Sequence, residues 1–342
     1  MTLRSEGDAR ADDGSGPSRL IVVVVGLIAL LAAAYTAYLW GQFLLEIGTA
    51  GLPGSNAGPD FRTFSVAGSL ARVGNVADLY NPSAISYEIA NAAAYVYPSW
   101  FAISMIPLSG MGFQAGYWMW LSVTAAFAAG SLAKLHRRVG VVAFLIAFIG
   151  PAGFKTVLPG QSAFLMLGLS AVIAWAMVNR HDRTAGVAAG LMAFKPHMVL
   201  GLGFVWLLRW KRFGTSIVSA VAAGVILYGG SELLLPGSMA GWISLVTDSS
   251  VELVHPRAEI TLGAAARLLL GDGSIGTAVT VLLVIGGVAW LASVIHRRVV
   301  DDGTLLLAAF GAAAVLSLHA LLYDTFVIVP ALVLVWRARP WL

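Results

Sequence analysis

The chain has 342 residues, of which 58% are hydrophobic and only 11% are charged. A soluble domain carries about 25% charged residues, so this composition excludes a water-soluble fold for most of the chain. The formal net charge of +4 does not indicate a nucleic-acid-binding surface, because Lys and Arg occur in short clusters between apolar runs. The absence of cysteine excludes disulfides and thiolate chemistry.

Apolar runs long enough to cross ~30 Å of hydrocarbon recur from residue 20 towards the C-terminus. In lipid the backbone polar groups must be satisfied within each segment, which predicts α-helices, and the solid apolar blocks lack the alternation of a β-barrel. We therefore predict an all-α, polytopic membrane helical bundle with about nine to eleven transmembrane helices. Residues 1–19 are predicted to be a disordered cytoplasmic tail, and residues 20–342 a single transmembrane domain.

The first predicted span covers residues 20–45 and leaves the cytoplasm. The polar, amphipathic stretch 46–97 is predicted to be a non-cytoplasmic loop with one or two helices on the membrane surface. Residues 98–107 are apolar but fall short of the ~17 residues a span needs, which leaves a re-entrant piece or a short tilted span open. Aromatic residues around this segment predict an interfacial belt: Tyr95, Tyr97, Trp100, Trp118 and Trp120.

Segment 184–208 is long enough for only two half-length helices, and Pro196 breaks the helix in its middle. We expect a hairpin whose tip reaches the far half of the bilayer, where broken helices are tolerated if they line a cavity. The other expected spans occupy residues 117–133, 139–149, 164–178, 216–235, 277–295, 305–318 and 326–336, with a second outer loop over 236–261 and a short apolar piece over 262–270.

Charge sorting predicts the topology. The tail and the short basic loops hold fifteen of the Lys and Arg residues, at positions 4, 10, 19, 134, 137, 138, 180, 183, 209, 211, 212, 297, 298, 337 and 339. The positive-inside rule assigns these segments, and both termini, to the cytoplasm. Ten carboxylates fall on the other side, at positions 46, 60, 78, 88, 232, 248, 252, 259, 272 and 324. The polar chemistry is therefore predicted to face outward.

Two places in the chain carry candidate chemistry. Asp60 follows Gly58-Pro59 just after the first span, where a carboxylate can act as a general base near neutral pH; a helix N-cap is the alternative. Lys195 and His197 flank the predicted helix break, and an ionisable group at depth is a functional hypothesis. An ammonium there can hold a phosphate with help from the helix dipole. Snorkelling, or burial against Glu232 or another acid, is the alternative.

Further polar residues lie where predicted helices meet the outer surface. Gln161, His319 and Asp324 are candidates for hydrogen bonds to sugar hydroxyls or phosphate oxygens, with interfacial anchoring or capping as the alternative. No metal-ligand spacing stands out, no Ser–His–Asp set can be placed, and the Gly-rich segment 52–59 lacks the ending of a phosphate-binding loop.

Several short motifs occur in an order that resembles a known family. They are Gly58-Pro59-Asp60-Phe61, Leu79-Tyr80-Asn81-Pro82, Val96-Tyr97-Pro98-Ser99, Gly160-Gln161-Ser162, Phe194-Lys195-Pro196-His197 followed by Arg209-Trp210, and Ser317 through Tyr323-Asp324. The ordered set resembles the multi-spanning, polyprenol-phosphate-sugar-dependent glycosyltransferases of the bacterial α-(1,2)-mannosyltransferase-like group, glycosyltransferase family eighty-seven. Ser99, Ser162 and Leu318 depart from its pattern.

The resemblance implies a C-type glycosyltransferase architecture with amphipathic helices in the first outer loop. It implies transfer of a hexose, with mannose expected, from a polyprenyl-phosphate donor to a lipid or glycan acceptor with inversion. The expected location is the periplasmic or extracellular face of a bacterial inner membrane. By the family's pattern Asp60 is the general base. The donor-binding candidates are Lys195, His197, Gln161, His319 and Arg62, and the other candidates are Tyr80, Tyr97, Tyr323 and Asp324. Neither a cofactor nor an obligatory metal is expected.

Two alternatives differ in class. A secondary transporter or lipid flippase would also explain a broken helix with Lys195 at depth, although the chain shows no internal repeat and has a long, carboxylate-bearing first outer loop. A non-catalytic assembly partner for envelope enzymes is the second alternative, and loss of activity on changing Asp60 alone would argue against it.

Overall fold

A computed structural model gives the fold and describes residues 19–50, 58–88, 94–248, 259–271, 273–297, 301–316 and 320–338. The regular secondary structure of this part of the chain is helical, apart from one isolated antiparallel bridge between Glu259 and Leu321. In chain order the elements are α1 (Arg19–Ala50), α2 (Pro59–Arg72), α3 (Val76–Leu79), α4 (Pro82–Glu88), α5 (Ser99–Ser109), α6 (Phe113–Leu135), α7 (Arg137–Ile149), α8 (Pro151–Val157), α9 (Ala163–Val178), α10 (Asp182–Met192), α11 (Pro196–Leu208), α12 (Trp210–Leu234), α13 (Ser238–Thr247), α14 (Leu262–Leu270), α15 (Ser274–Arg297), α16 (Asp302–Leu316), η2 (Leu322–Ile328) and α17 (Val329–Ala338).

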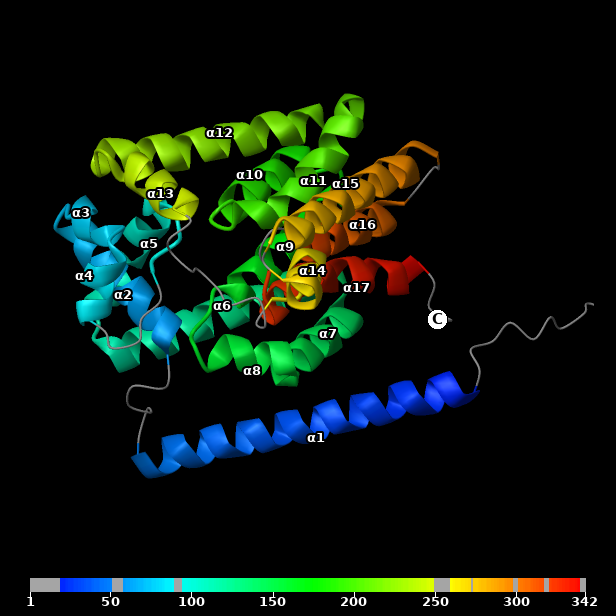
Figure 1. Cartoon of the computed structure of the whole chain (residues 1–342), viewed down its shortest axis with the longest axis horizontal. Helices are drawn as coiled ribbons and strands as arrows, with labels where there is room; N and C mark the ends of the chain where they lie inside the picture. The colour runs from blue at the N-terminus through cyan, green and yellow to red at the C-terminus, as the bar shows by residue number, and fades with distance from the viewer. Residues whose placement is uncertain are drawn as a thin grey trace, which may run out of the picture.

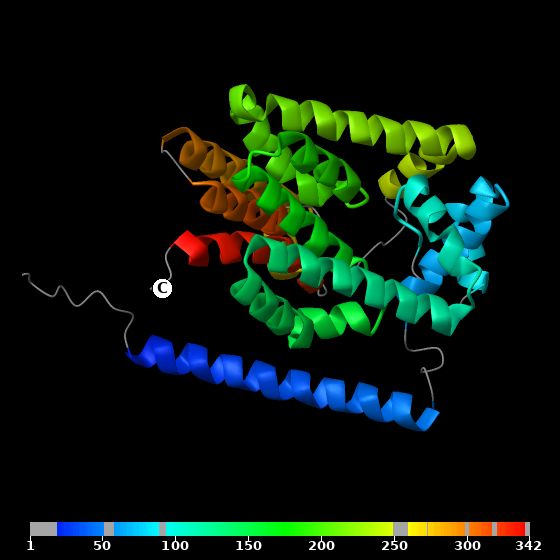
Figure 2. The same ribbon diagram turned by 180° about the vertical axis from the view of Figure 1, so that it is seen from behind.

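Helix α9 forms the centre of the bundle. It is apolar around its whole circumference and most of its residues are buried, as expected for a helix that is covered on all sides. Helices α6 and α10 pack against it, and α12 covers α10 on the outside (Figure 1). Helix α1 lies along another side of the bundle and contacts it through α8, as the view from behind also shows (Figure 2).

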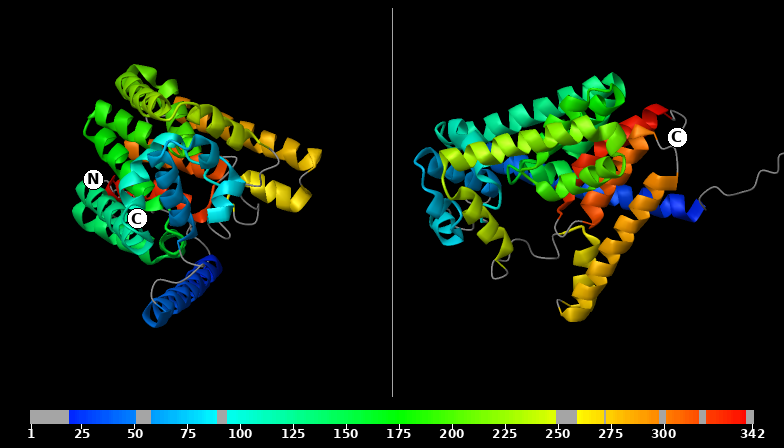
Figure 3. Two further views of the ribbon diagram at one scale, coloured as in Figure 1. Left: turned by 90° about the vertical axis from the view of Figure 1, so that its left-hand side faces the viewer. Right: turned by 90° about the horizontal axis from the view of Figure 1, so that it is seen from above.

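The outermost helices carry the membrane character. Helices α12 and α15 are long and apolar enough to cross a membrane, and α7 with α8 forms a third candidate that is bent by 67°. Their apolar side chains face outward, with Ile226 72% and Leu282 66% exposed. Such continuous exposed apolar surface is unsuited to water. In the right-hand view of Figure 3 the hairpin of α14 and α15 projects away from the other helices.

The predicted class of an all-helical membrane protein therefore stands, but the predicted nine to eleven crossings are not confirmed. Among the described helices two qualify as spans, or three with the bent pair. Several expected spans are short apolar helices, such as α5 with 11 residues, α11 with 13 and α16 with 15. The described residues of the first outer loop form three helices, α2 to α4, rather than one or two. A further helix, α13, occupies the second loop.

The predicted aromatic belt is wrong for most of its members. Tyr95, Tyr97 and Trp120 are 1%, 8% and 6% exposed and belong to the apolar core. Tyr97 stacks on Phe101 at a centroid distance of 5.0 Å. Trp118 is 41% exposed and alone among these four faces outward. These rings fill the space between α2, α5 and α6, where large apolar side chains give dense packing.

The helix break at Pro196 is confirmed. Helix α10 ends at Met192 and α11 begins at Pro196, whose ring suits the first position of a helix because that position needs no N–H donor. The Tyr228 hydroxyl of α12 donates to the Ala193 carbonyl at 2.7 Å and so fixes the turn between the two helices. Lys195 occupies this turn.

Candidate functional site

The site begins at a close contact between two turns that are far apart in sequence. Gly58 and Gly160 both have positive φ, 71° and 77°, a conformation that glycine adopts without strain. A Cβ on Gly160 would lie 2.6 Å from the Cβ of Phe61, so no larger residue fits this approach. The turn between α8 and α9 therefore reaches the start of α2.

Backbone hydrogen bonds fix this contact. The first N–H groups of a helix have no partner within it, and here the N–H groups of Asp60 and Phe61 donate to the Pro159 carbonyl at 3.0 and 3.1 Å. The Gly58 N–H donates to the Leu158 carbonyl at 2.8 Å. The α8–α9 turn thus caps α2, and it brings Gln161, which lies in the same turn, beside Asp60.

Asp60 accepts a hydrogen bond from this neighbour rather than capping its own helix. The Gln161 Nε2 donates to Asp60 Oδ2 at 2.6 Å. Gly58 is the N-cap of α2, and no side chain makes a capping hydrogen bond there. The alternative interpretation of Asp60 as a helix cap is therefore wrong. Asp60 is partly exposed, whereas Gln161 is 5% exposed.

Burial raises the pKa of the Asp60 carboxyl from its usual 3.8 to about 6, although the hydrogen bond from Gln161 and the positive charge of Lys195 both act to lower it. Loss of hydration penalises the charged form of a carboxyl, and a donor or a cation favours it. The result is a carboxylate that is ionised at neutral pH and basic enough to accept a proton. Such a pKa suits a general base.

Lys195 and Asp324 form a buried ion pair beside this carboxylate. The Lys195 Nζ lies 2.7 Å from Asp324 Oδ1, and the side chains are 8% and 1% exposed. The second Asp324 oxygen accepts the Leu321 N–H at 2.9 Å. The Lys195 Nζ also lies 4.7 Å from the centre of the Tyr323 ring. The alternative of burial against an acid thus holds for Lys195, with Asp324 as the acid.

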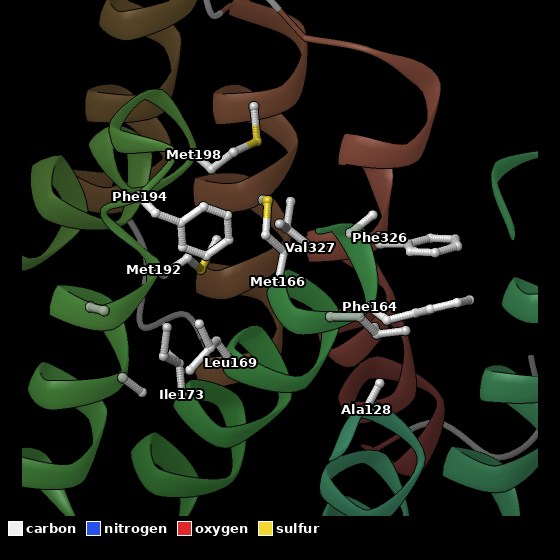
Figure 4. Close-up of a cluster of buried hydrophobic side chains, with 14 of the residues drawn as sticks. Ala128, Phe164, Met166, Leu169, Ile173, Met192, Phe194, Met198, Phe326 and Val327 are labelled. Carbon is white, nitrogen blue, oxygen red and sulfur yellow. The ribbon is translucent and has the colours of Figure 1, made fainter. Parts of the chain in front are cut away.

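An apolar layer supports this ion pair. Phe194 precedes Lys195, and Phe326 follows Asp324 by two residues; both are buried, at 1% and 3% exposure. Figure 4 shows Phe194 with Met166 and Met192 in one cluster, and Phe326 next to Phe164. The Phe164 and Phe326 rings stack with centroids 5.8 Å apart. The ion pair itself is nearly inaccessible to water, at 8% and 1% exposure, which strengthens its electrostatic interaction.

Tyr97 connects the two halves of the site. Its hydroxyl lies 3.4 Å from Gln161 Oε1, and it interacts electrostatically with both Asp60 and Lys195. Tyr80 holds the Tyr97 segment in place, since its hydroxyl donates to the Tyr97 carbonyl at 3.3 Å. Five segments distant in sequence therefore contribute to one cluster: the start of α2, residues 94–98, the turns before α9 and α11, and η2.

Arg62 lies in α2 and His197 in α11, each two residues from a member of the cluster. The Arg62 guanidinium lies over the Phe113 ring at 3.9 Å, on α6. His197 is in the first turn of α11, partly buried and close to Lys195 in sequence. His319 lies outside the described residues. In the described part of the chain no group of three or more His, Asp or Glu residues is arranged to hold a metal ion.

Residues on α12 and α13 hold the site's backbone, a role that the sequence did not reveal; the sequence suggested only sugar stacking or anchoring for Trp242. The Trp242 Nε1 donates to the Val96 carbonyl at 2.9 Å. Ser99 exchanges hydrogen bonds with Ser231 and Ser238 at 2.9 and 2.8 Å. These partners are more than 130 residues apart, and no local pattern signals them. Only the unusual Ser99 in the motif Val96-Tyr97-Pro98-Ser99 could have drawn attention to them.

Comparison with known proteins identifies the family. Neither the curated proteins nor the solved structures gave a match to the chain. The family model described as glycosyltransferase family 87 matches residues 95–341. This range includes Tyr97, Gln161, Lys195 and Asp324 and begins after Asp60. It covers well over half of the chain, so the chain belongs to glycosyltransferase family 87.

Proposed function

We propose that the chain transfers a hexose, with mannose expected, from a polyprenyl-phosphate donor to a hydroxyl of a lipid or glycan acceptor, with inversion. The observation that carries this proposal is the partly exposed Asp60 carboxylate, held by Gln161 within electrostatic range of the buried Lys195. A base and a cation in one cluster match the two charges that develop in such a transfer.

Asp60 is the general base in this mechanism. The acceptor hydroxyl oxygen attacks the anomeric carbon while Asp60 takes its proton. The bond between the anomeric carbon and the phosphate oxygen breaks, and its electron pair leaves with polyprenyl phosphate. A single displacement of this kind inverts the anomeric centre. Since the pKa of Asp60 is about 6, the carboxylate is available at neutral pH.

Lys195 stabilises the phosphate charge in this mechanism. An ammonium has three donors, of which one is directed at Asp324, so a phosphate oxygen can be a further partner. The adjacent N-terminus of α11 adds its dipole. His197, His319 and Arg62 are proposed to assist in donor binding, and Tyr80, Tyr97, Tyr323 and Asp324 to shape the site. Gln161, which the family resemblance makes a candidate for donor binding, donates to Asp60.

The polyprenyl tail is proposed to lie in lipid against the exposed apolar helices. The site is proposed to face the periplasm or the cell exterior, with both termini in the cytoplasm of a bacterial cell. In support, the helices α2 to α4 and α13 lie at one end of the bundle, and the start of α1 and the end of α17 lie towards the other (Figure 1). Positive-inside charge sorting assigns the latter end to the cytoplasm.

The test of the donor class uses purified protein in lipid vesicles with radiolabelled mannose. One sample contains polyprenyl-phosphate mannose and the other a nucleotide-diphosphate mannose at equal radioactivity, each with membrane glycolipid acceptors. We expect label in product only from the lipid-linked donor. Transfer from the nucleotide donor alone would refute the proposed donor class. If label is transferred from neither donor, and from no other lipid-phosphate sugar that is tried, the result would favour a transporter or flippase.

A further inference from the structure

Hydrogen bonds hold the backbone around Gln161 in place, and with it the position from which the side chain extends. The Gln161 N–H donates to the Thr156 carbonyl at 2.9 Å, and the Trp120 indole donates to the Gly160 carbonyl at 3.1 Å. The Tyr117 hydroxyl donates to the carbonyl of Val157, the last residue of α8, just before this turn. Gln161 itself is 5% exposed. A buried amide on a braced turn has little freedom to reorient.

The surroundings also fix which end of the amide faces Asp60. Two donors point at Gln161 Oε1, the Ser162 N–H and the Tyr97 hydroxyl, each at 3.4 Å. A flipped amide would place its NH₂ group against the Ser162 N–H, donor against donor, and leave its oxygen facing the carboxylate. The observed orientation directs the NH₂ group at Asp60 Oδ2 at 2.6 Å.

The two carboxylate oxygens of Asp60 therefore have different surroundings. One oxygen is occupied by the amide, and within the described residues the other accepts no hydrogen bond. Because Asp60 is partly exposed while Gln161 and Tyr97 are buried, an acceptor hydroxyl can reach the carboxylate but not the amide that holds it. A carboxylate with one oxygen fixed and the other open has a single direction for accepting a proton.

We infer that Gln161 and Tyr97 are positioning residues for Asp60: the Gln161 amide holds one carboxylate oxygen, Tyr97 keeps the amide from flipping, and the free oxygen takes the acceptor's proton. The inference rests on the proposed role of Asp60 and deepens it. It assigns Gln161 to the base rather than to the donor's sugar or phosphate. Gln161 transfers no proton, because its amide only donates to Asp60.

The pH dependence of transfer distinguishes a positioning role of Gln161 from a role in donor binding. Gln161 stabilises the ionised form of Asp60, so its removal raises the pH at which the base becomes active. A charge-assisted hydrogen bond contributes about 1.5 kcal/mol, which corresponds to about one pH unit. The other groups facing Asp60 stay in place in a Gln161 variant: Lys195 between α10 and α11, Tyr97 before α5 and Tyr323 of η2. On α6, Tyr117 packs at the start of α2.

The experiment measures transfer from polyprenyl-phosphate mannose between pH 5 and 9 for wild type, Gln161→Leu and Gln114→Leu. Gln114 is an exposed amide on α6 and serves as the matched control. For Gln161→Leu we expect the acid limb of kcat to move upward by about one pH unit. We expect kcat on the plateau to fall roughly tenfold because the base loses its orientation, and the donor KM to stay within about twofold. Gln114→Leu should match wild type.

The result that would overturn the inference is a raised donor KM with an unmoved acid limb, since this would place Gln161 on the donor. Unchanged kinetics would overturn it as well. Asp60→Asn is measured in parallel: if it keeps wild-type transfer, the proposed role of Asp60 fails, whereas an inactive Asp60→Asn beside an unperturbed Gln161→Leu defeats only the inference.

A second variant keeps the test open if Gln161→Leu does not fold. Tyr97→Phe removes one hydroxyl and keeps the ring that stacks on Phe101 and Phe194. The amide then loses one of its two orienting donors, so we expect the same upward shift of the acid limb at smaller size, with kcat reduced about threefold. A Tyr97→Phe enzyme with the wild-type pH profile and kcat would refute the role of Tyr97 in orienting the amide.

Discussion

Breaking the buried ion pair of Lys195 and Asp324 should destabilise the protein strongly, and removing both charges should restore much of the loss. Asp324→Asn keeps the shape and an acceptor for the Leu321 N–H, but leaves an ammonium without its carboxylate at a site with only 8% and 1% exposure. Removing one partner of a buried pair costs about 3–5 kcal/mol. Lys195→Met should cost about the same, because it strands the carboxylate.

The double variant Lys195→Met/Asp324→Asn has no unpaired charge, so we expect it to lose only about 2 kcal/mol. The coupling energy of the cycle is then about 4 kcal/mol or more, which is well above the error for independent sites. Equilibrium unfolding in mixed detergent micelles measures all four proteins. Asp302→Asn is the control, because its pair with Arg212 is 29% and 13% exposed and should contribute about 1 kcal/mol or less. Additive losses at Lys195 and Asp324 would refute the reasoning.

Gly160→Ala puts a Cβ 2.6 Å from the Cβ of Phe61 at a φ of 77°. It should lower the free energy of unfolding by ~1–3 kcal/mol and reduce the rate of transfer. A variant with the wild-type stability and rate would contradict this. Wild-type transfer should fall as the pH drops through about 6, because a general base acts only when ionised; a rate that rises on acidification would indicate a general acid. Tyr228→Phe removes the hydroxyl that donates to the Ala193 carbonyl, so it should lower the free energy of unfolding by ~1 kcal/mol and slow transfer. The control Trp118→Phe, at an exposed position, should match wild type. A Tyr228→Phe rate equal to that of wild type would exclude a positioning role.

The helices themselves could be predicted from local pattern. Pro196 lacks an N–H donor, so the break between α10 and α11 follows from the residue type. The apolar stretch 98–107 becomes α5 within two residues of its expected ends. The ordered motifs also indicate the family, which the match over residues 95–341 shows; Asp60 lies outside that range.

The pairings within the site could not be predicted in this way. Gln161 is 101 residues from Asp60, and Asp324 is 129 residues from Lys195. Such contacts depend on how helices pack and rotate against one another, and periodicity within one helix carries no information on that. Hydropathy likewise does not separate lipid-facing helices from buried ones, since α9 is as apolar as a span yet lies in the core. Aromatic residues near a membrane surface likewise suit either an interfacial belt or a buried cluster. Their sequence therefore predicts a belt where the structure has a core.

The central claim is that Asp60 is the base for sugar transfer from a polyprenyl-phosphate donor. The most direct measurement compares label transfer from polyprenyl-phosphate mannose by wild type, Asp60→Asn and Asp78→Asn, after equal thermal stability has been established. Asp78 is a matched carboxylate in the same outer loop, where it accepts a hydrogen bond from Asn75 at 2.6 Å. We expect that, of the two variants, only Asp60→Asn abolishes transfer. Transfer by Asp60→Asn at the wild-type rate would contradict it.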